Sequence, residues 1–155
     1  MQIAITKKTH YLCQYTVTRD DRSVEDFTLE TKTYFLHDIC HFVVERNLQY
    51  AAGFWGMLAR GMAIHELNGK TNLQTAELRF IEQIVGPVQS VYSGHLPEQL
   101  FEQFVAHLDF IVPAKFLTDC LSEISSIIAT WEGLPLGGQL ELDWTLPLTN
   151  ENIIA

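Results

Sequence analysis

Cysteine, positive charge and long hydrophobic runs are all scarce in this chain of 155 residues. Its three cysteines, Cys13, Cys40 and Cys120, are widely spaced and include no CxxC pair. An odd number at such spacing argues against both a disulfide framework and a thiolate zinc site. We therefore expect three buried free thiols, the usual state of an unpaired cysteine.

Positive charge is outweighed by negative charge, with 10 Lys and Arg residues against 19 Asp and Glu residues and a formal net charge of -9. A chain of this charge repels nucleic-acid phosphates and anionic lipid headgroups. No basic stripe interrupts the acidic pattern. We therefore expect neither a nucleic acid nor a membrane as a partner.

No hydrophobic run approaches the roughly 18 residues that a membrane span requires. Residues 1–8 alternate like a strand and lack the apolar segment of a signal peptide. We therefore expect a cytoplasmic protein. Because 47% of the residues are hydrophobic and 19% are charged, the composition predicts one ordered globular domain over residues 1–155.

Segments near both ends of the chain alternate in the manner of β-strands. The N-terminal region 2–29 contains three of them, over residues 2–7, 11–18 and 24–29, and a fourth covers about 139–147. Strict alternation is typical of antiparallel strands with one face in water. We expect the C-terminal strand to join the N-terminal ones in one small antiparallel sheet.

The region between these strands, about 33–132, shows mainly helical periodicity. We expect about five helices, over residues 34–48 with Thr31 or Thr33 as N-cap, 51–67, 75–92 with a stop or kink at Gly86-Pro87, 97–108 and 113–131. Residues 68–72 are rich in turn formers. The predicted fold class is therefore α+β, a small antiparallel sheet built from both chain ends and packed on about five helices.

One run in the first expected helix carries recognisable chemistry. Residues 36–45 read LHDICHFVVE, which places His37, His41 and Glu45 at successive spacings of four. Residues four apart on a helix project from nearly the same face. Two imidazoles and a carboxylate suit zinc, iron or nickel as divalent ions. Because Glu45 lies farther round the helix from His37, it is a ligand, a base beside the metal, or a partner that orients His41.

A further ligand must come from another segment, and His65 is the best candidate. A short turn near residue 50 would make the first two helices antiparallel and pair residue 65 with about residue 35. The predicted metal ligands are therefore His37, His41 and His65, with Asp38 or Glu45 handling a proton on bound water. The remaining acidic residues, Glu82 among them, are spaced like solvated helix faces.

The pattern His37-Asp38-x-x-His41 resembles the HExxH helix of zinc metallohydrolases. The resemblance implies that the two histidines bind zinc and that Asp38 polarises water, although Asp38 is one methylene shorter than the family's Glu. No distant third-ligand motif of that family is present. The wider pattern HDxxHFxxE, followed by GFWGML over residues 53–58, resembles a group of small uncharacterised bacterial proteins, which implies no known activity.

A purely structural interpretation of the same helix is also consistent with the sequence. Asp38 would face the positive end of the helix dipole, and His41 would pair with Glu45. Function would then reside in an apolar pocket or homodimer face that contains Phe54, Trp55, Met57 and Met62, unless these side chains are simply core.

The sequence thus leaves two functions open. The first is a divalent-metal-binding protein, with zinc as the metal and metal-dependent hydrolysis as its chemistry. The second is a non-enzymatic binding or oligomerisation module whose His/Asp/Glu helix is structural. Neither interpretation identifies a small-molecule ligand.

Overall fold

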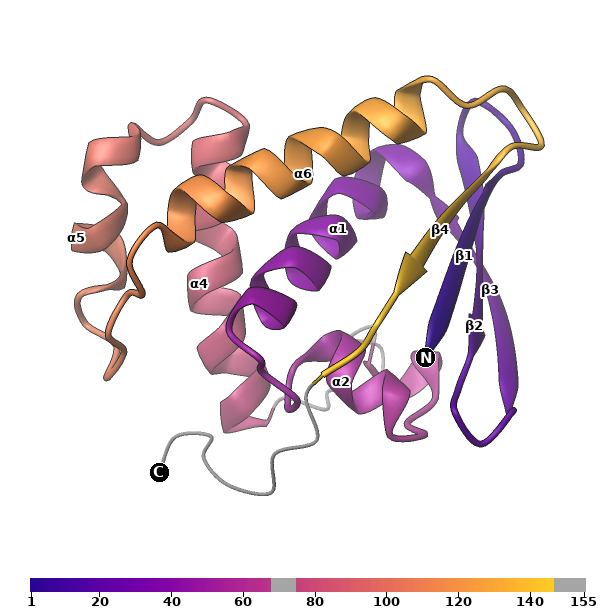
Figure 1. Cartoon of the computed structure of the whole chain (residues 1–155), viewed down its shortest axis with the longest axis horizontal. Coiled ribbons are helices and arrows are strands. Elements are labelled where there is room, and N and C mark those ends of the chain that lie inside the picture. Colours follow the sequence, from indigo (N-terminus) through magenta and orange to yellow (C-terminus); the bar gives the residue numbers. More distant parts are fainter. Residues whose placement is uncertain (68–74, 147–155) are drawn as a thin grey trace.

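The computed structural model describes residues 1–67 and 75–146. Its sheet contains four strands, β1 (Gln2–Lys7), β2 (Leu12–Thr18), β3 (Val24–Glu30) and β4 (Gln139–Asp143). They pair in the order β3-β2-β1-β4, with every neighbour antiparallel. The α+β prediction, with a sheet built from both chain ends, is confirmed (Figure 1). The C-terminal strand ends at Asp143, before the predicted 147, which lies outside the described residues.

The sheet has one face against the helices and one face in water. In β1, Ile3 and Ile5 are almost completely buried, and they pair with the equally buried Val17 and Tyr15 of β2. The alternating positions, such as Ala4, are more exposed. Because side chains alternate across a strand, this pattern follows directly from the order of apolar and polar residues.

The helices are α1 (Thr31–Asn47), α2 (Phe54–Ala59), α3 (Ile64–Leu67), α4 (Ala76–Tyr92), α5 (Phe101–Val105), preceded by a 3₁₀ turn at Glu98–Leu100, and α6 (Phe116–Glu132). Figure 1 shows α1 between the sheet on one side and α4 and α6 on the other. Its buried residues accordingly occur on several sides of the helix, as in Ile39, Phe42 and Val43. A helix enclosed in this way also buries its polar side chains.

The predicted helix 51–67 is wrong in extent, because the chain forms α2 and α3 with a turn between them. Gly61 in that turn has φ 104°, a left-handed conformation that favours glycine. The buried guanidinium of Arg19 donates to the carbonyls of Leu58 and Met62, at 2.6 and 3.0 Å. These backbone oxygens are therefore satisfied without a continuous helix.

The helix predicted over 75–92 is continuous from Ala76 to Tyr92, so it does not stop at Gly86-Pro87. A proline clashes with the Cβ of the residue before it when that residue is helical, and Gly86 has no Cβ. The predicted turn at 68–72 lies outside the described residues.

The other helix limits differ from prediction by a few residues. The first helix begins at Thr31 with Glu30 as N-cap, so neither Thr31 nor Thr33 caps it. Only Phe101–Val105 is α-helical within the predicted helix 97–108, and α6 starts at Phe116 rather than at 113.

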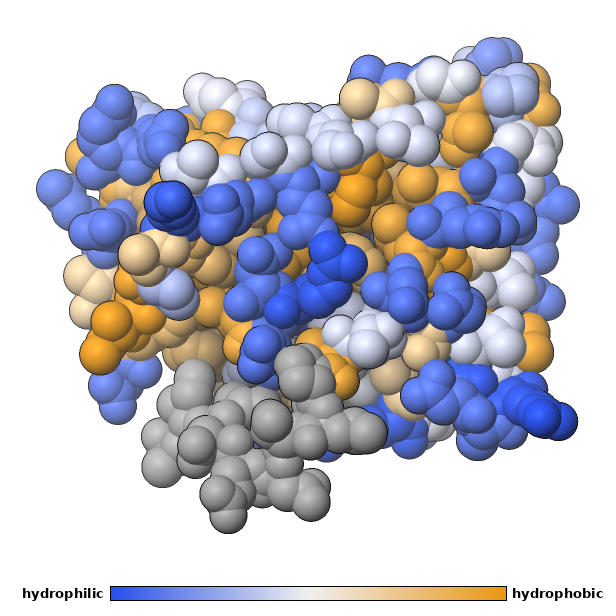
Figure 2. All heavy atoms as spheres, viewed as in Figure 1, coloured by the Kyte–Doolittle hydropathy of each residue, from blue (hydrophilic) through white to orange (hydrophobic). Residues whose placement is uncertain are grey.

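The cysteines lie in the core, and some hydrophobic side chains lie on the surface. All three cysteines are buried and free, as predicted. Figure 2 shows hydrophobic residues among hydrophilic ones over α5 and the segment after it, where Phe104 and Ile111 are exposed. None of the helices in the described ranges has the length and apolar character needed to cross a membrane.

Candidate metal centre

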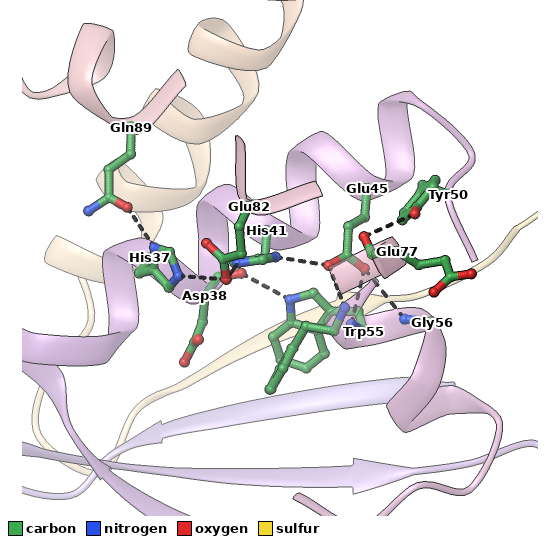
Figure 3. Close-up of polar contacts among 11 residues, drawn as sticks. His37, Asp38, His41, Glu45, Tyr50, Trp55, Gly56, Glu77, Glu82 and Gln89 are labelled. Atoms are coloured by element: carbon green, nitrogen blue, oxygen red, sulfur yellow. Dashed lines mark hydrogen bonds and ion pairs between the residues drawn. The ribbon is translucent and has the colours of Figure 1, made fainter. Parts of the chain in front are cut away.

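Three side chains from two helices converge between α1 and α4. His37 and His41 come from α1 and Glu82 comes from α4, and their ligand atoms lie within 4.8 Å of one another. Glu82 Oε1 is 2.8 Å from His41 Nε2 and 3.6 Å from His37 Nε2. Figure 3 shows both rings directed at this one carboxylate. The arrangement is a two-histidine, one-carboxylate set of the kind that binds divalent transition metals.

The opposite nitrogen of each ring is held by an acceptor. His41 Nδ1 is 2.9 Å from Glu45 Oε1, and His37 Nδ1 is 2.8 Å from Gln89 Oε1. Because both partners are oxygen acceptors, each Nδ1 can carry a proton and donate it to them. In a neutral ring Nε2 then keeps its lone pair, and it is Nε2 that faces Glu82. Metal-binding histidines are oriented by outer acceptors in this same way.

Glu45 is itself fixed by the start of α2. Its carboxylate is completely buried and accepts backbone N–H groups of Phe54, Trp55 and Gly56 at 2.7, 3.0 and 3.5 Å. Gly53 leaves the space that the carboxylate occupies, since a Cβ there would lie 2.3 Å from Glu45 Cδ. Of the three roles open to Glu45 in the sequence, this geometry is that of the partner that orients His41.

The electrostatics of the cluster favour a protonated His41 beside an ionised Glu82 when no ion is bound. Burial opposes the charged form of His41, but its hydrogen bonds to Glu45 and Glu82 outweigh burial and raise its pKa to about 10. The nearby carboxylate of Glu82 also raises the pKa of His37. Burial opposes ionisation of Glu82, yet its polar contacts with the two histidines hold its pKa well below the usual range. A metal ion at this position would therefore have to replace the proton on His41 Nε2.

Asp38 lies outside the cluster of ligand atoms. Figure 3 shows its side chain directed toward the sheet, and there its Oδ2 accepts the Tyr15 hydroxyl at 2.8 Å. Its backbone carbonyl accepts the indole N–H of Trp55 at 2.9 Å. Burial raises the pKa of the Asp38 carboxyl to about 6. The water-polarising position implied by the HExxH resemblance is therefore not the one that Asp38 occupies.

Asp38 should make the stability of the metal-free protein depend on pH. Its pKa rises from 3.8 to about 6 on folding. The contribution of this carboxyl to the free energy of unfolding is therefore fully present below about pH 4 and is lost as the pH rises through about 6. The shift of about two units corresponds to about 3 kcal/mol. We expect Asp38→Asn to remove this loss, because Asn still accepts the Tyr15 hydroxyl without a charge. Urea unfolding in EDTA between about pH 4 and 8 tests it, and equal pH profiles for variant and wild type would contradict it.

His65 is not part of the cluster. It lies exposed on α3, and Glu82 takes the third position that His65 was predicted to fill. The expected pairing of residue 65 with residue 35 assumed one helix over 51–67, whereas α2 ends at Ala59. The spacing of the acidic residues had indicated that Glu82 is solvated, and its side chain is indeed half-exposed. The sequence contained one weak indication of this role for Glu82. Glu82 and Gln89 are seven residues apart and therefore share one face of α4.

The aromatic and methionine residues after Gly53 are mainly core. Trp55 is completely buried and stacks on Tyr15 with ring centres 6.1 Å apart, while Met57 is 8% exposed. Phe54 and Met62 are half-buried. A depression of about 410 Å³ is lined by Met57, Arg60, Met62 and Glu66. Core packing therefore accounts for Trp55 and Met57.

Comparison with protein families, curated proteins and solved structures finds no match to this chain. The chemistry of the site is accordingly inferred from its own residues and their geometry.

Proposed function

We propose that the protein binds one divalent transition-metal ion, zinc in the first instance, through His37 Nε2, His41 Nε2 and Glu82 Oε1. The observation that carries the proposal is the orientation of the two rings. Both Nε2 atoms face one carboxylate oxygen, while both Nδ1 atoms donate to the outer acceptors Glu45 and Gln89.

The two distances from Glu82 fit an ion with little rearrangement. Zinc bonds of about 2.1 Å in a tetrahedral arrangement separate ligand atoms by about 3.4 Å. The observed separations from Glu82 Oε1 are 2.8 Å to His41 Nε2 and 3.6 Å to His37 Nε2. Glu82 is 51% exposed, so its side chain can move by the few tenths of an ångström required. His41 is 4% exposed and tied to Glu45, and it provides the rigid side of the centre.

The proposal extends to metal-dependent hydrolysis by a cytoplasmic protein. Three protein ligands and a water molecule make up a catalytic zinc site, and the ion supplies a hydroxide near neutral pH by acidifying that water. In this chain Glu45 and Gln89 would keep the two histidines in the ligating tautomer. Asp38 would contribute to the fold beneath α1 rather than to the reaction.

A second function is favoured by one observation, namely that His41 has a carboxylate at each of its two ring nitrogens. Protonated His41 satisfies both Glu45 and Glu82 without any ion. The cluster would then be a structural ion network, and the protein would be a binding or oligomerisation module. The exposed side chains of Phe104 and Ile111 would be the natural contact residues of a homodimer. This alternative predicts no metal.

Elemental analysis after zinc loading and desalting separates the two functions. We expect tag-free wild-type protein to retain about one zinc per chain, and both His37→Ala/His41→Ala and Glu82→Gln to retain little or none. His107→Ala is the matched control, because His107 is exposed and pairs with Gln83, the neighbour of Glu82, at 2.7 Å. Wild-type protein that holds no zinc would contradict the proposal and leave the structural network.

A further inference from the structure

The chain supplies only three ligand atoms to the centre among the residues that the structure describes. The two nearest other carboxylates on α1 are engaged elsewhere. Asp38 accepts the hydroxyl of Tyr15, and Glu45 accepts three backbone N–H groups of α2 in addition to His41. Divalent transition metals take four to six ligands. At least one coordination position must therefore be filled by something other than these side chains.

The exposure of the three ligands shows on which side that position lies. His41 is 4% exposed and lies against the interior, whereas His37 and Glu82 are 36% and 51% exposed. The buried side of the centre is thus occupied by the ring of His41 and the carboxylate of Glu45, which is completely buried. The remaining coordination position would therefore lie on the solvent side of the centre.

The charges indicate which ligands that position favours. Among the three ligands, the two charges of a bound ion would be offset only by the single charge of Glu82, while the charge of Glu45 lies behind His41 on the buried side, so positive charge would remain on the solvent-facing side of the ion. Oxygen-donor anions match both this charge and the preference of nitrogen- and oxygen-ligated ions. Gln89, which lies on α4 with Glu82 and contacts His37, is uncharged and does not repel an anion.

We propose that the centre binds small oxygen-donor anions, carboxylates and hydroxamates, directly on the metal at this solvent-facing position. The proposal rests on the metal-binding function proposed above, and it assigns a class of ligand to the same site. Carboxylates are also the products of ester and amide hydrolysis. The same position would therefore suit the product of hydrolysing an ester or an amide.

Cobalt(II) and acetohydroxamate test the proposal. Cobalt(II) replaces zinc at nitrogen and oxygen sites, and its visible spectrum reports the number and arrangement of its ligands. We expect titration of cobalt-loaded wild-type protein with acetohydroxamate to shift the visible bands, with saturation at about one hydroxamate per cobalt. The His107→Ala control should titrate like wild type. Cobalt content is measured after desalting at the end of each titration.

The outcomes distinguish failure of this inference from failure of the proposed function. An unchanged spectrum with cobalt retained would show a closed coordination sphere, and it would overturn the inference while leaving metal binding intact. Loss of cobalt from the protein during the titration would also overturn it, because the hydroxamate would then be binding the ion in solution. Failure of wild-type protein to bind cobalt or zinc at all would overturn both.

Discussion

Replacement of Glu45 by alanine is expected to lower the free energy of unfolding by about 3–5 kcal/mol, the range for removing one member of a buried charged network. The carboxylate is completely buried and joins His41 to the first N–H groups of α2. Without it, an imidazole and several N–H groups are left buried and unpaired. A cavity adds to the loss, because the side chain fills the space above Gly53.

Urea unfolding in EDTA measures this effect without a contribution from bound metal. Glu132→Ala is the matched control, since Glu132 is the exposed last residue of α6, and its removal should change the unfolding free energy by less than about 0.5 kcal/mol. Glu45→Gln should lie between wild type and Glu45→Ala, because one amide oxygen still accepts while the amide NH₂ faces donors. A loss below about 1 kcal/mol in Glu45→Ala would show that the carboxylate is not the buried anchor described above.

Substitution of Gly53 by alanine is expected to have an effect of similar origin, a loss of about 3 kcal/mol. The new Cβ would lie 2.3 Å from Glu45 Cδ and 2.5 and 2.7 Å from its two oxygens. The backbone of Gly53 has φ -88°, so the obstacle is this contact rather than the backbone conformation. Relief of the contact displaces a carboxylate that four donors hold in place. We therefore expect weaker zinc binding as well as lower stability.

A comparison of variants isolates the contact between Gly53 and Glu45. Gly133→Ala is the control, because its Cβ would meet nothing closer than 3.6 Å and its φ of -74° suits alanine. In a double-mutant cycle, Gly53→Ala/Glu45→Ala should be about as stable as Glu45→Ala alone, since truncation of Glu45 removes the clash. Additive losses in the double variant would contradict the contact.

Local periodicity was enough to predict the elements on which the centre is built. Alternating residues such as Ile3 and Ile5 predicted β1, and the four-residue spacing of His37 and His41 predicted that their rings share one face of α1. Both features depend only on the repeat of the backbone within a strand or a helix. The antiparallel sheet built from both chain ends followed from the same alternation.

Contacts between distant segments could not be read from these repeats. Glu82 is 41 positions after His41 and reaches it only because α4 packs on α1. The turn that interrupts the predicted helix 51–67 is bound by Arg19, which donates to the Leu58 carbonyl from 39 positions earlier in the chain. A local sequence pattern does not predict such partners, because each contact depends on how whole helices and strands pack together.

The surroundings of α1 set the roles of its acidic residues for the same reason. A helical repeat places Asp38 and Glu45 near the histidines, but the sheet beneath and α2 beside them determine where their carboxylates point. Tyr15 draws Asp38 toward the sheet, and the N–H groups of α2 hold Glu45 against His41. The two histidines and their common face were thus set by the order of residues along the chain. The third ligand, the outer acceptors and the side of the centre open to solvent were set by packing, because buried polar groups take whichever partners the neighbouring elements supply.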